Sequence, residues 1–138
     1  MLNHTLIHPA ILEALGSAGH GSRILIADGN YPASTKCGVN SDLVYLNLRP
    51  GFPTVTEVLD VLLTAIPVEG AMVMAPDDGP EPPIFAEFRE RLAPVALSPC
   101  DRFQFYDEAG SSDTCLTIVS GEQRIYANLL LTIGVRMA

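Results

Sequence analysis

The sequence predicts an α/β protein, a three-layer α/β/α arrangement around a mostly parallel sheet, formed as one domain by residues 1–138. Its short apolar runs, such as residues 23–27, lack the polar alternation of a half-exposed strand and indicate strands covered on both faces. Amphipathic helical patterns separate these runs, as in alternating α/β architectures. A chain of 138 residues is long enough to bury one such core.

Cap and stop residues delimit the predicted helices. Pro9 suits a first helical position, and Gly19 suits the position just past a helix end. Thr54 and Glu57 have the spacing of a capping box, and Pro67 ends the apolar stripe that follows them. These signals predict helices at residues 9–18, 55–66 and 84–92.

The remaining elements are strands and loops. A surface loop is expected at residues 76–83, which contain four prolines. Residues 102–106 alternate as a strand does, but Asp101 and Gly110 supply an N-cap and a C-terminal stop, so we favour a helix there. The expected strands cover residues 23–27, 43–48, 71–75, 114–119 and 126–135.

The charge of the chain narrows the class of ligand. Its formal net charge is −8, and its eight basic residues are scattered along the sequence. Nucleic-acid backbones are bound by clustered lysines and arginines, so a nucleic-acid partner is excluded, and anionic membranes and substrates would be repelled. No apolar run approaches the roughly 20 residues that span a bilayer. A neutral small molecule is the expected partner.

Hydrophobic and cysteine content bear on assembly and location. Hydrophobic residues make up 48% of the chain, more than a soluble monomer of this size needs, which favours a homo-oligomer with apolar interfaces. The three cysteines form no CxxC pair, and an odd count indicates reduced thiols. The N-terminus carries no basic stretch followed by an apolar segment, so we expect a cytoplasmic protein.

His20 and Asp28 are the first candidates for chemistry. His20 lies between two glycines in a turn, and histidine exchanges protons near neutral pH. Asp28 ends a buried strand, where parallel sheets place their ligands, although an aspartate there also caps the following turn. The strand between them spans roughly 15 Å. The two residues therefore share a pocket only through folded-back loops or a neighbouring subunit.

Further polar and aromatic candidates lie at the expected element ends. In a strand, Tyr126 and Asn128 project from one face, where a phenol and an amide together offer donors and acceptors to hydroxyl groups. The alternative is a pair of satisfied polar residues at a strand start. Arg102 either clamps a hydroxyl or pairs with a surface acid. Tyr31 either stacks on a ligand or packs in the protein.

Other chemistries find no support in the sequence. His4, His8 and His20 do not have the spacing of zinc ligands, and no cysteine pair supplements them. The turn around His20 lacks the spaced glycines and the lysine of a phosphate-binding loop. A Gly-x-Ser-x-Gly elbow of a serine hydrolase is absent. We expect no metal and no other cofactor.

A series of short motifs runs in order through nearly the whole chain. They are Gly19-His20-Gly21, Ala27-Asp28, Asn30-Tyr31-Pro32-Ala33, Arg102-Phe103-Gln104-Phe105-Tyr106, Gly121-Glu122 and Tyr126-x-Asn128. In this order and spacing the chain resembles the RbsD/FucU family of sugar mutarotases. The Arg-Phe-x-Phe-Tyr segment is more similar to the fucose mutarotase branch than to the ribose pyranase branch.

The resemblance implies an α/β fold assembled into a ring, typically a decamer of two stacked pentamers. It also implies an active site at a subunit boundary, which would overcome the distance between His20 and Asp28. By this resemblance His20 is the expected acid/base group, with Tyr126 as its partner in proton transfer. The expected sugar-binding residues are Asp28, Tyr31, Arg102 and Asn128.

The implied reaction is the interconversion of ring forms of a free monosaccharide, L-fucose or a related sugar, by general acid–base opening and closure of the ring. Ser22 stands where the family often has aspartate, and Ala127 stands where fucose-type members often have glycine. The preferred sugar therefore stays open, as does the choice between anomer and pyranose–furanose exchange. The alternatives are a non-catalytic sugar-binding or transport-accessory protein and a scaffold protein.

Overall fold

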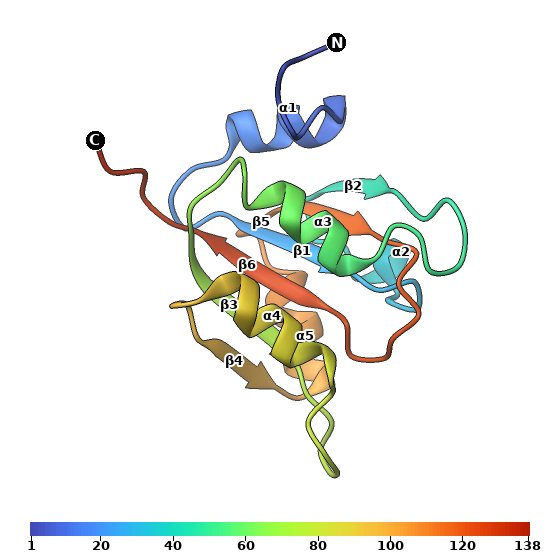
Figure 1. Cartoon of the computed structure of the whole chain (residues 1–138). Coiled ribbons are helices and arrows are strands. Elements are labelled where there is room, and N and C mark those ends of the chain that lie inside the picture. The colour runs from blue at the N-terminus through green and yellow to red at the C-terminus, as the bar shows by residue number, and fades with distance from the viewer.

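Six strands form one sheet in the computed structural model of the chain, which describes residues 1–138 (Figure 1). The strands are β1 (Arg23–Ala27), β2 (Asp42–Tyr45), β3 (Val68–Met74), β4 (Leu97–Cys100), β5 (Thr114–Val119) and β6 (Leu129–Ile133). The helices are α1 (Pro9–Ser17), α2 (Ala33–Lys36), α3 (Val55–Leu62), α4 (Ile84–Leu92) and α5 (Arg102–Ala109).

The strand order across the sheet is β2-β5-β1-β6-β3-β4. β6 runs antiparallel to its neighbours β1 and β3, and every other neighbouring pair is parallel. Leu25 in the middle of β1 pairs with Thr117 of β5 on one side and with Leu130 of β6 on the other. The prediction of a mostly parallel sheet is confirmed.

Helices cover both faces of the sheet, with α1, α3 and α4 on one face and α2 and α5 on the other (Figure 1). Ile24 and Ile26 of β1 belong to the first core, and Leu25 and Ala27 belong to the second. This division follows from the strand geometry, because successive side chains point to opposite faces. The three-layer α/β/α prediction is therefore also confirmed.

The larger core depends on apolar side chains of α3 and α4. Leu59, Leu62 and Phe88 are at most 1% exposed, and burial of each such side chain stabilises the fold by about 1.5–3 kcal/mol. The predicted capping box starts α3. Thr54 Oγ1 accepts from the Glu57 N–H at 3.2 Å, and Glu57 Oε2 accepts from the Thr54 N–H at 2.7 Å.

The ambiguous segment after Asp101 is a helix, α5, as the cap signals predict. Asp101 Oδ1 accepts from the backbone N–H groups of Phe103 and Gln104 at 2.9 and 3.0 Å. Within α5, Phe105 is fully buried, whereas Phe103 is 66% exposed. The N-cap therefore overrides the strand-like alternation, because it satisfies backbone donors that a helix start leaves free.

The structure departs from the expected elements around Tyr126. This residue adopts a left-handed backbone with φ +61° within a turn, so β6 begins only at Leu129. The expectation that Tyr126 and Asn128 share one strand face is wrong. The sequence also missed α2 and β4, because four residues are too few to establish a period. β2 and α3 are shorter than expected.

The strand directions bring distant loops to one end of the sheet, here called the carboxyl end. Asp28 follows β1, Ser120 follows β5 and Asp101 follows β4 at this end. Because β6 is antiparallel, its first residue lies at the same end, and Asn128 joins the group. His20 precedes β1 and therefore lies at the opposite end, here called the amino end.

Candidate active site

Asp28 and Asn128 form a reciprocal pair at the carboxyl end. The backbone N–H of Asp28 donates to Asn128 Oδ1 at 2.9 Å, and Asn128 Nδ2 donates to Asp28 Oδ2 at 2.9 Å. Asp28 Oδ1 also accepts from the Asn30 N–H at 2.9 Å. Asp28 is only 4% exposed and Asn128 only 3%. Two residues from opposite parts of the sequence are thus fixed against each other.

The charge of Asp28 is incompletely compensated. Burial removes water from the carboxylate and raises its pKa, and the hydrogen bonds from Asn30 and Asn128, which lower the pKa, do not offset this effect. Its hydrogen-bond donors are all neutral amides. A buried carboxylate with a raised pKa is a candidate for proton or hydroxyl chemistry.

Arg102 and Tyr126 line one cavity of about 410 Å³ at the carboxyl end. The residues around it are Ala75, Asp77, Asp101, Arg102, Phe103 and Tyr126. Ala75 follows β3 and Arg102 begins α5, so the cavity lies where these elements meet the turn before β6. Tyr126 connects the cavity to the Asp28–Asn128 pair, since only Ala127 separates it from Asn128.

The backbone of Tyr126 is strained. A left-handed φ of +61° costs a residue other than glycine about 1–2 kcal/mol. The residues that follow it, Ala127 and Asn128, are buried at 0% and 3% exposure and hold the turn in place. Strain of this kind persists where the surroundings fix it and is common at functional sites.

Glu122 anchors the start of this turn. Its Oε1 accepts from Arg124 Nε at 3.0 Å and its Oε2 accepts from Arg124 Nη2 at 2.8 Å. Backbone N–H groups of Gln123, Arg124 and Val55 also donate to it. Burial by itself raises the pKa of Glu122, but the hydrogen bonds and charge of Arg124 outweigh burial and lower the pKa. The carboxylate therefore ties the loop to the start of α3.

Tyr31 is packed inside the protein rather than exposed in the Arg102 cavity. It is 7% exposed, and its ring meets the rings of Phe105 and Tyr106 edge-on at centroid distances of 6.2 and 5.4 Å. Its buried hydroxyl has no hydrogen-bond partner in the chain. Burial strongly raises the pKa of this phenol. This hydroxyl is therefore a buried polar group without a partner in the protein.

His20 lies at the amino end and contacts Glu69. His20 Nε2 is 2.9 Å from Glu69 Oε1 and 3.0 Å from Glu69 Oε2, and the two side chains are 60% and 45% exposed. Gly21 next to it takes a positive φ of +85°, and its N–H donates to the carbonyl of Ile133 at the end of β6. The turn is therefore fixed to the sheet, while the imidazole remains open to solvent.

The structure brings Asp28, Arg102, Tyr126 and Asn128 to one end of the sheet and leaves His20 at the other. Sequence reasoning missed Glu69, which is 49 positions from His20 and shares no motif with it. It also missed Asp77, because a proline-rich stretch signals a surface loop and nothing about its neighbours.

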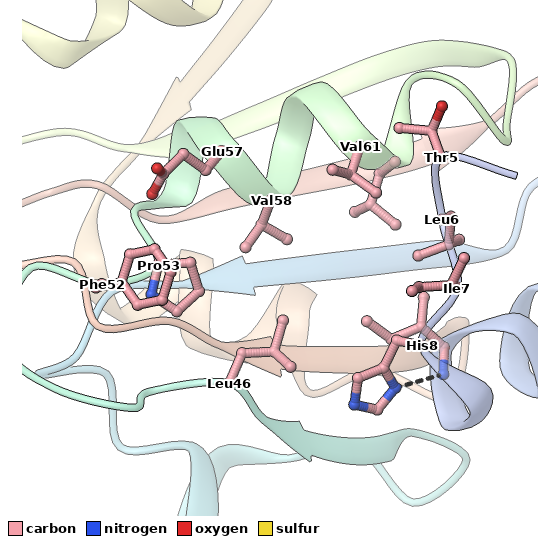
Figure 2. Close-up of a pocket in the computed structure, with 12 residues that line it drawn as sticks. Thr5, Leu6, Ile7, His8, Leu46, Phe52, Pro53, Glu57, Val58 and Val61 are labelled. Carbon is pink, nitrogen blue, oxygen red and sulfur yellow. Dashed lines mark hydrogen bonds between the residues drawn. The ribbon is translucent and has the colours of Figure 1, made fainter. Parts of the chain in front are cut away.

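A second cavity, of about 300 Å³, lies between the N-terminal segment and α3 (Figure 2). Its walls are mainly apolar and include Leu6 and Val58. His8 and Glu57 also line it, but His8 Nδ1 accepts from the Ile11 N–H at 3.4 Å and Glu57 caps α3. This cavity holds none of the candidate residues.

No group of three or more histidine, cysteine, aspartate and glutamate side chains is placed to hold a metal ion. The thiols of Cys37, Cys100 and Cys115 are all free. Burial raises the pKa of Cys100 and Cys115, so neither has the character of an activated nucleophile. None of the helices is long and apolar enough to cross a membrane.

Comparison with known proteins gives this geometry a family context. The model of the RbsD / FucU transport protein family matches residues 1–136. The fucose mutarotase of Homo sapiens is 29% identical over 144 residues, which cover 94% of this chain and 90% of the human protein. The D-ribose pyranase of Streptomyces avermitilis is 34% identical over 130 residues, which cover 94% of this chain and 95% of that protein.

A solved structure has the same architecture. The fucose mutarotase from Streptococcus pneumoniae in complex with L-fucose matches with a TM-score of 0.84 at 24% identity, covering 99% of this chain and 100% of that chain. The match extends over the whole sheet and both helical layers, so the expected fold is confirmed. With a family model that covers nearly every residue, the motif resemblance is confirmed as well, and the chain belongs to the RbsD/FucU family.

Proposed function

We propose that the protein is a cytoplasmic monosaccharide mutarotase that interconverts ring forms of L-fucose or a related free sugar. The observation that carries the proposal is the buried Asp28–Asn128 pair at the same end of the sheet as Arg102 and Tyr126, with Asn128 two residues after Tyr126 in the chain. The activities named for the relatives in man and in Streptomyces support the reaction class. The Arg-Phe-x-Phe-Tyr segment that begins α5 favours the fucose branch.

Mutarotation needs two proton transfers and no net redox change. One group removes the proton of the anomeric hydroxyl while another protonates the ring oxygen, which opens the hemiacetal to the free aldehyde. Rotation about the C1–C2 bond exposes the other face, and the reverse transfers close the ring. General acid–base catalysis of this kind contributes about 10²–10⁴-fold.

In this mechanism His20 carries the main proton transfer and Tyr126 serves as its partner. Glu69 accepts the Nε2–H of a neutral His20, which leaves Nδ1 free to accept a proton from the sugar. Glu69 is thus a positioning residue for His20.

The carboxyl-end residues hold the sugar. The Asp28 carboxylate accepts from the Asn30 N–H and from Asn128 Nδ2, and a carboxylate has about four acceptor sites, so acceptor capacity remains for a sugar hydroxyl. The second N–H of the Asn128 amide and the guanidinium of Arg102 act as donors. These donors and acceptors complement the mixed donor and acceptor character of hydroxyl groups.

One chain places His20 and Tyr126 at opposite ends of β1, about 15 Å apart by strand length. We therefore propose that a neighbouring protomer supplies His20 and that the sites lie at subunit boundaries of a ring, a decamer of two stacked pentamers. Phe103 at the cavity and Ile125 beside it are 66% and 70% exposed. Apolar side chains of this size next to a polar cavity fit a surface that a second protomer covers.

The first test is saturation-transfer proton NMR on L-fucose and D-ribose, with and without the protein. We expect faster exchange between anomeric signals, and His20→Ala should slow this exchange by about 10²–10⁴-fold. His4→Ala is the matched control, because His4 is exposed in the N-terminal segment before α1. Saturable sugar binding without faster exchange would instead support the sugar-binding or transport-accessory alternative.

The boundary arrangement has its own test. His20→Ala and Tyr126→Phe should each abolish exchange, but oligomers reassembled from an equal mixture should regain about one quarter of the wild-type rate, the share of boundaries at which two intact residues meet. Complete lack of recovery in mixed oligomers of the correct size would place both residues in sites within one chain and overturn the boundary proposal.

A further inference from the structure

The cavity beside Tyr126 contains two opposite charges that do not meet. Asp77 and Arg102 both line it, yet neither side chain forms a hydrogen bond or an ion pair with another residue of the chain. The guanidinium of Arg102 is held over the ring of Phe103, with its central carbon 4.8 Å from the ring centroid. The third charge at the cavity, Asp101, is engaged in capping α5.

Four of the seven arginines of this chain, Arg23, Arg89, Arg91 and Arg124, pair with a carboxylate, and Arg102 does not. Arg102 lines the same cavity as the carboxylate of Asp77 but forms no ion pair with it. Opposite charges separated across about 410 Å³ leave room for a neutral ligand that bridges them.

Vicinal hydroxyl groups have the chemistry to bridge such a pair. A hydroxyl donates its proton to a carboxylate and accepts from a guanidinium, and hydrogen bonds to charged partners are the stronger kind. An anion would face the carboxylate of Asp77, and a cation would face Arg102, so the pair selects for an uncharged polyol. Tyr126 lines the same cavity, which leaves Asp77 and Arg102 to contact hydroxyls away from the reacting anomeric carbon.

We propose that Asp77 is a specificity-determining residue that, with Arg102, binds two adjacent ring hydroxyls of the sugar remote from C1. The inference rests on the proposed mutarotase function and deepens it by naming the substrate feature that is read. A site that hydrogen-bonds a substrate hydroxyl discriminates strongly against an analogue that presents it wrongly, because its charged groups are then left unpaired.

The chain offers a matched control in Asp78. It is the next residue of the same loop and has the same charge, but it lines a different cavity of about 740 Å³ together with the prolines of residues 76–83. Asp77→Asn and Asp78→Asn therefore change the net charge equally and test only which cavity the carboxylate serves.

The experiment compares wild type, Asp77→Asn and Asp78→Asn on L-fucose and on its C4 epimer, 6-deoxy-L-glucose, by anomer exchange and by equilibrium sugar binding. Asp77→Asn should raise KM and the dissociation constant about tenfold while kcat changes less than about threefold, as expected for one charge-assisted hydrogen bond made outside the reacting centre. Asp77→Asn should also reduce the ratio of the dissociation constants for the two epimers relative to the wild type. Asp78→Asn should match the wild type.

The outcomes separate the two proposals. Two outcomes would overturn the role of Asp77 and leave the mutarotase function intact. In the first, the wild type catalyses exchange and the two variants have the same KM and dissociation constant as each other. In the second, the wild type binds and exchanges the two epimers equally well. Binding that depends on Asp77 without any exchange would support the Asp77 assignment and overturn the mutarotase function. Absence of both binding and exchange with these sugars would overturn both.

Discussion

Asp28 and Glu122 are two buried carboxylates at the same end of the sheet, and they have opposite electrostatic roles. They are 4% and 3% exposed and follow the neighbouring parallel strands β1 and β5. Glu122 faces the guanidinium of Arg124. Asp28 has no cation beside it and accepts from neutral amide groups, including those of Asn30 and Asn128. Equal burial therefore does not imply equal compensation of charge.

The difference appears in their pKa values. Burial raises the pKa of both carboxyl groups, but only Glu122 has a cation and enough hydrogen bonds to reverse the effect, so its pKa is lowered while that of Asp28 is raised. A compensated carboxylate such as Glu122 stabilises the fold. A carboxylate that retains its desolvation cost, such as Asp28, reduces stability, and the gain lies in the chemistry it makes available.

The largest expected effect is on stability, from Glu122→Ala. This change removes the acceptor of Arg124 and of three backbone N–H groups. We expect the free energy of unfolding to fall by about 2–4 kcal/mol, below the full cost of breaking a buried pair because Arg124 keeps part of its hydration. Urea denaturation measures the change.

The control is Glu87→Ala, which removes the other carboxylate that Arg124 contacts. Glu87 is 41% exposed, and loss of an exposed ion pair costs less than about 1 kcal/mol. Equal destabilisation by the two variants would contradict the distinction between Glu122 and an ordinary surface partner.

The next effect concerns Asp28. Asp28→Asn converts one of two acceptor oxygens into an NH₂ donor that faces either Asn128 Nδ2 or the Asn30 N–H, which should cost about 1–3 kcal/mol of stability and slow sugar exchange about 100-fold. The combined change Asp28→Asn with Asn128→Asp allows the hydrogen bonds of the pair to form again with the side-chain donor and acceptor exchanged. The double variant should regain its stability, as measured by urea denaturation. Its sugar exchange, as measured by NMR, should remain slow. Recovery of exchange would show that the position of the carboxylate is unimportant.

The two carboxylates also predict opposite dependences of stability on pH. The lowered pKa of Glu122 gives stability that is present above its ordinary value of 4.5 and is lost as pH falls through the folded value. The raised pKa of Asp28 makes its ionised form a cost that is full above the folded value and absent below its ordinary value of 3.8. Between about pH 3 and 7, the stability of wild type relative to Glu122→Gln should rise with pH, and that relative to Asp28→Asn should fall. Parallel slopes for the two variants in urea titrations would contradict this assignment.

The smallest effect tests the buried hydroxyl of Tyr31, which has no hydrogen-bond partner in the chain. Tyr31→Phe removes a desolvated donor without a partner, so we expect the free energy of unfolding to rise by up to about 1 kcal/mol with exchange unchanged. Tyr106→Phe, in the ring that packs against it, is the control and should change neither quantity. A tenfold loss of exchange in Tyr31→Phe at unchanged stability would instead assign the hydroxyl a contact with the sugar.

Local signals explain what could be predicted of the fold. The N-cap of Asp101 decides that α5 is a helix, and the capping box from Thr54 to Glu57 decides where α3 begins, because each involves groups within three residues of one another. The apolar stripe of α3 and the apolar run of β1 predict burial by the same local logic. Elements of four residues, such as α2 and β4, escape it because they contain no full period.

The candidate site was predictable only in part. The position of Asp28 at a strand end follows from the apolar run before it, but its partner Asn128 is 100 positions away. Nothing near Asn128 in the sequence indicates that β6 runs antiparallel between β1 and β3. The contact of His20 with Glu69 and the burial of Tyr31 under α5 are likewise encounters between remote segments.

The sequence by itself therefore determined the α/β class, most helix boundaries, the separation of His20 from Asp28 and the family. The tertiary structure alone decided that Asn128 meets Asp28, that Tyr126 stands in a strained turn at the Arg102 cavity, and which buried carboxylate has a cation beside it. The physical reason is range. Caps, turns and periodicity act over a few residues, whereas the order and direction of strands are selected by packing of the whole core.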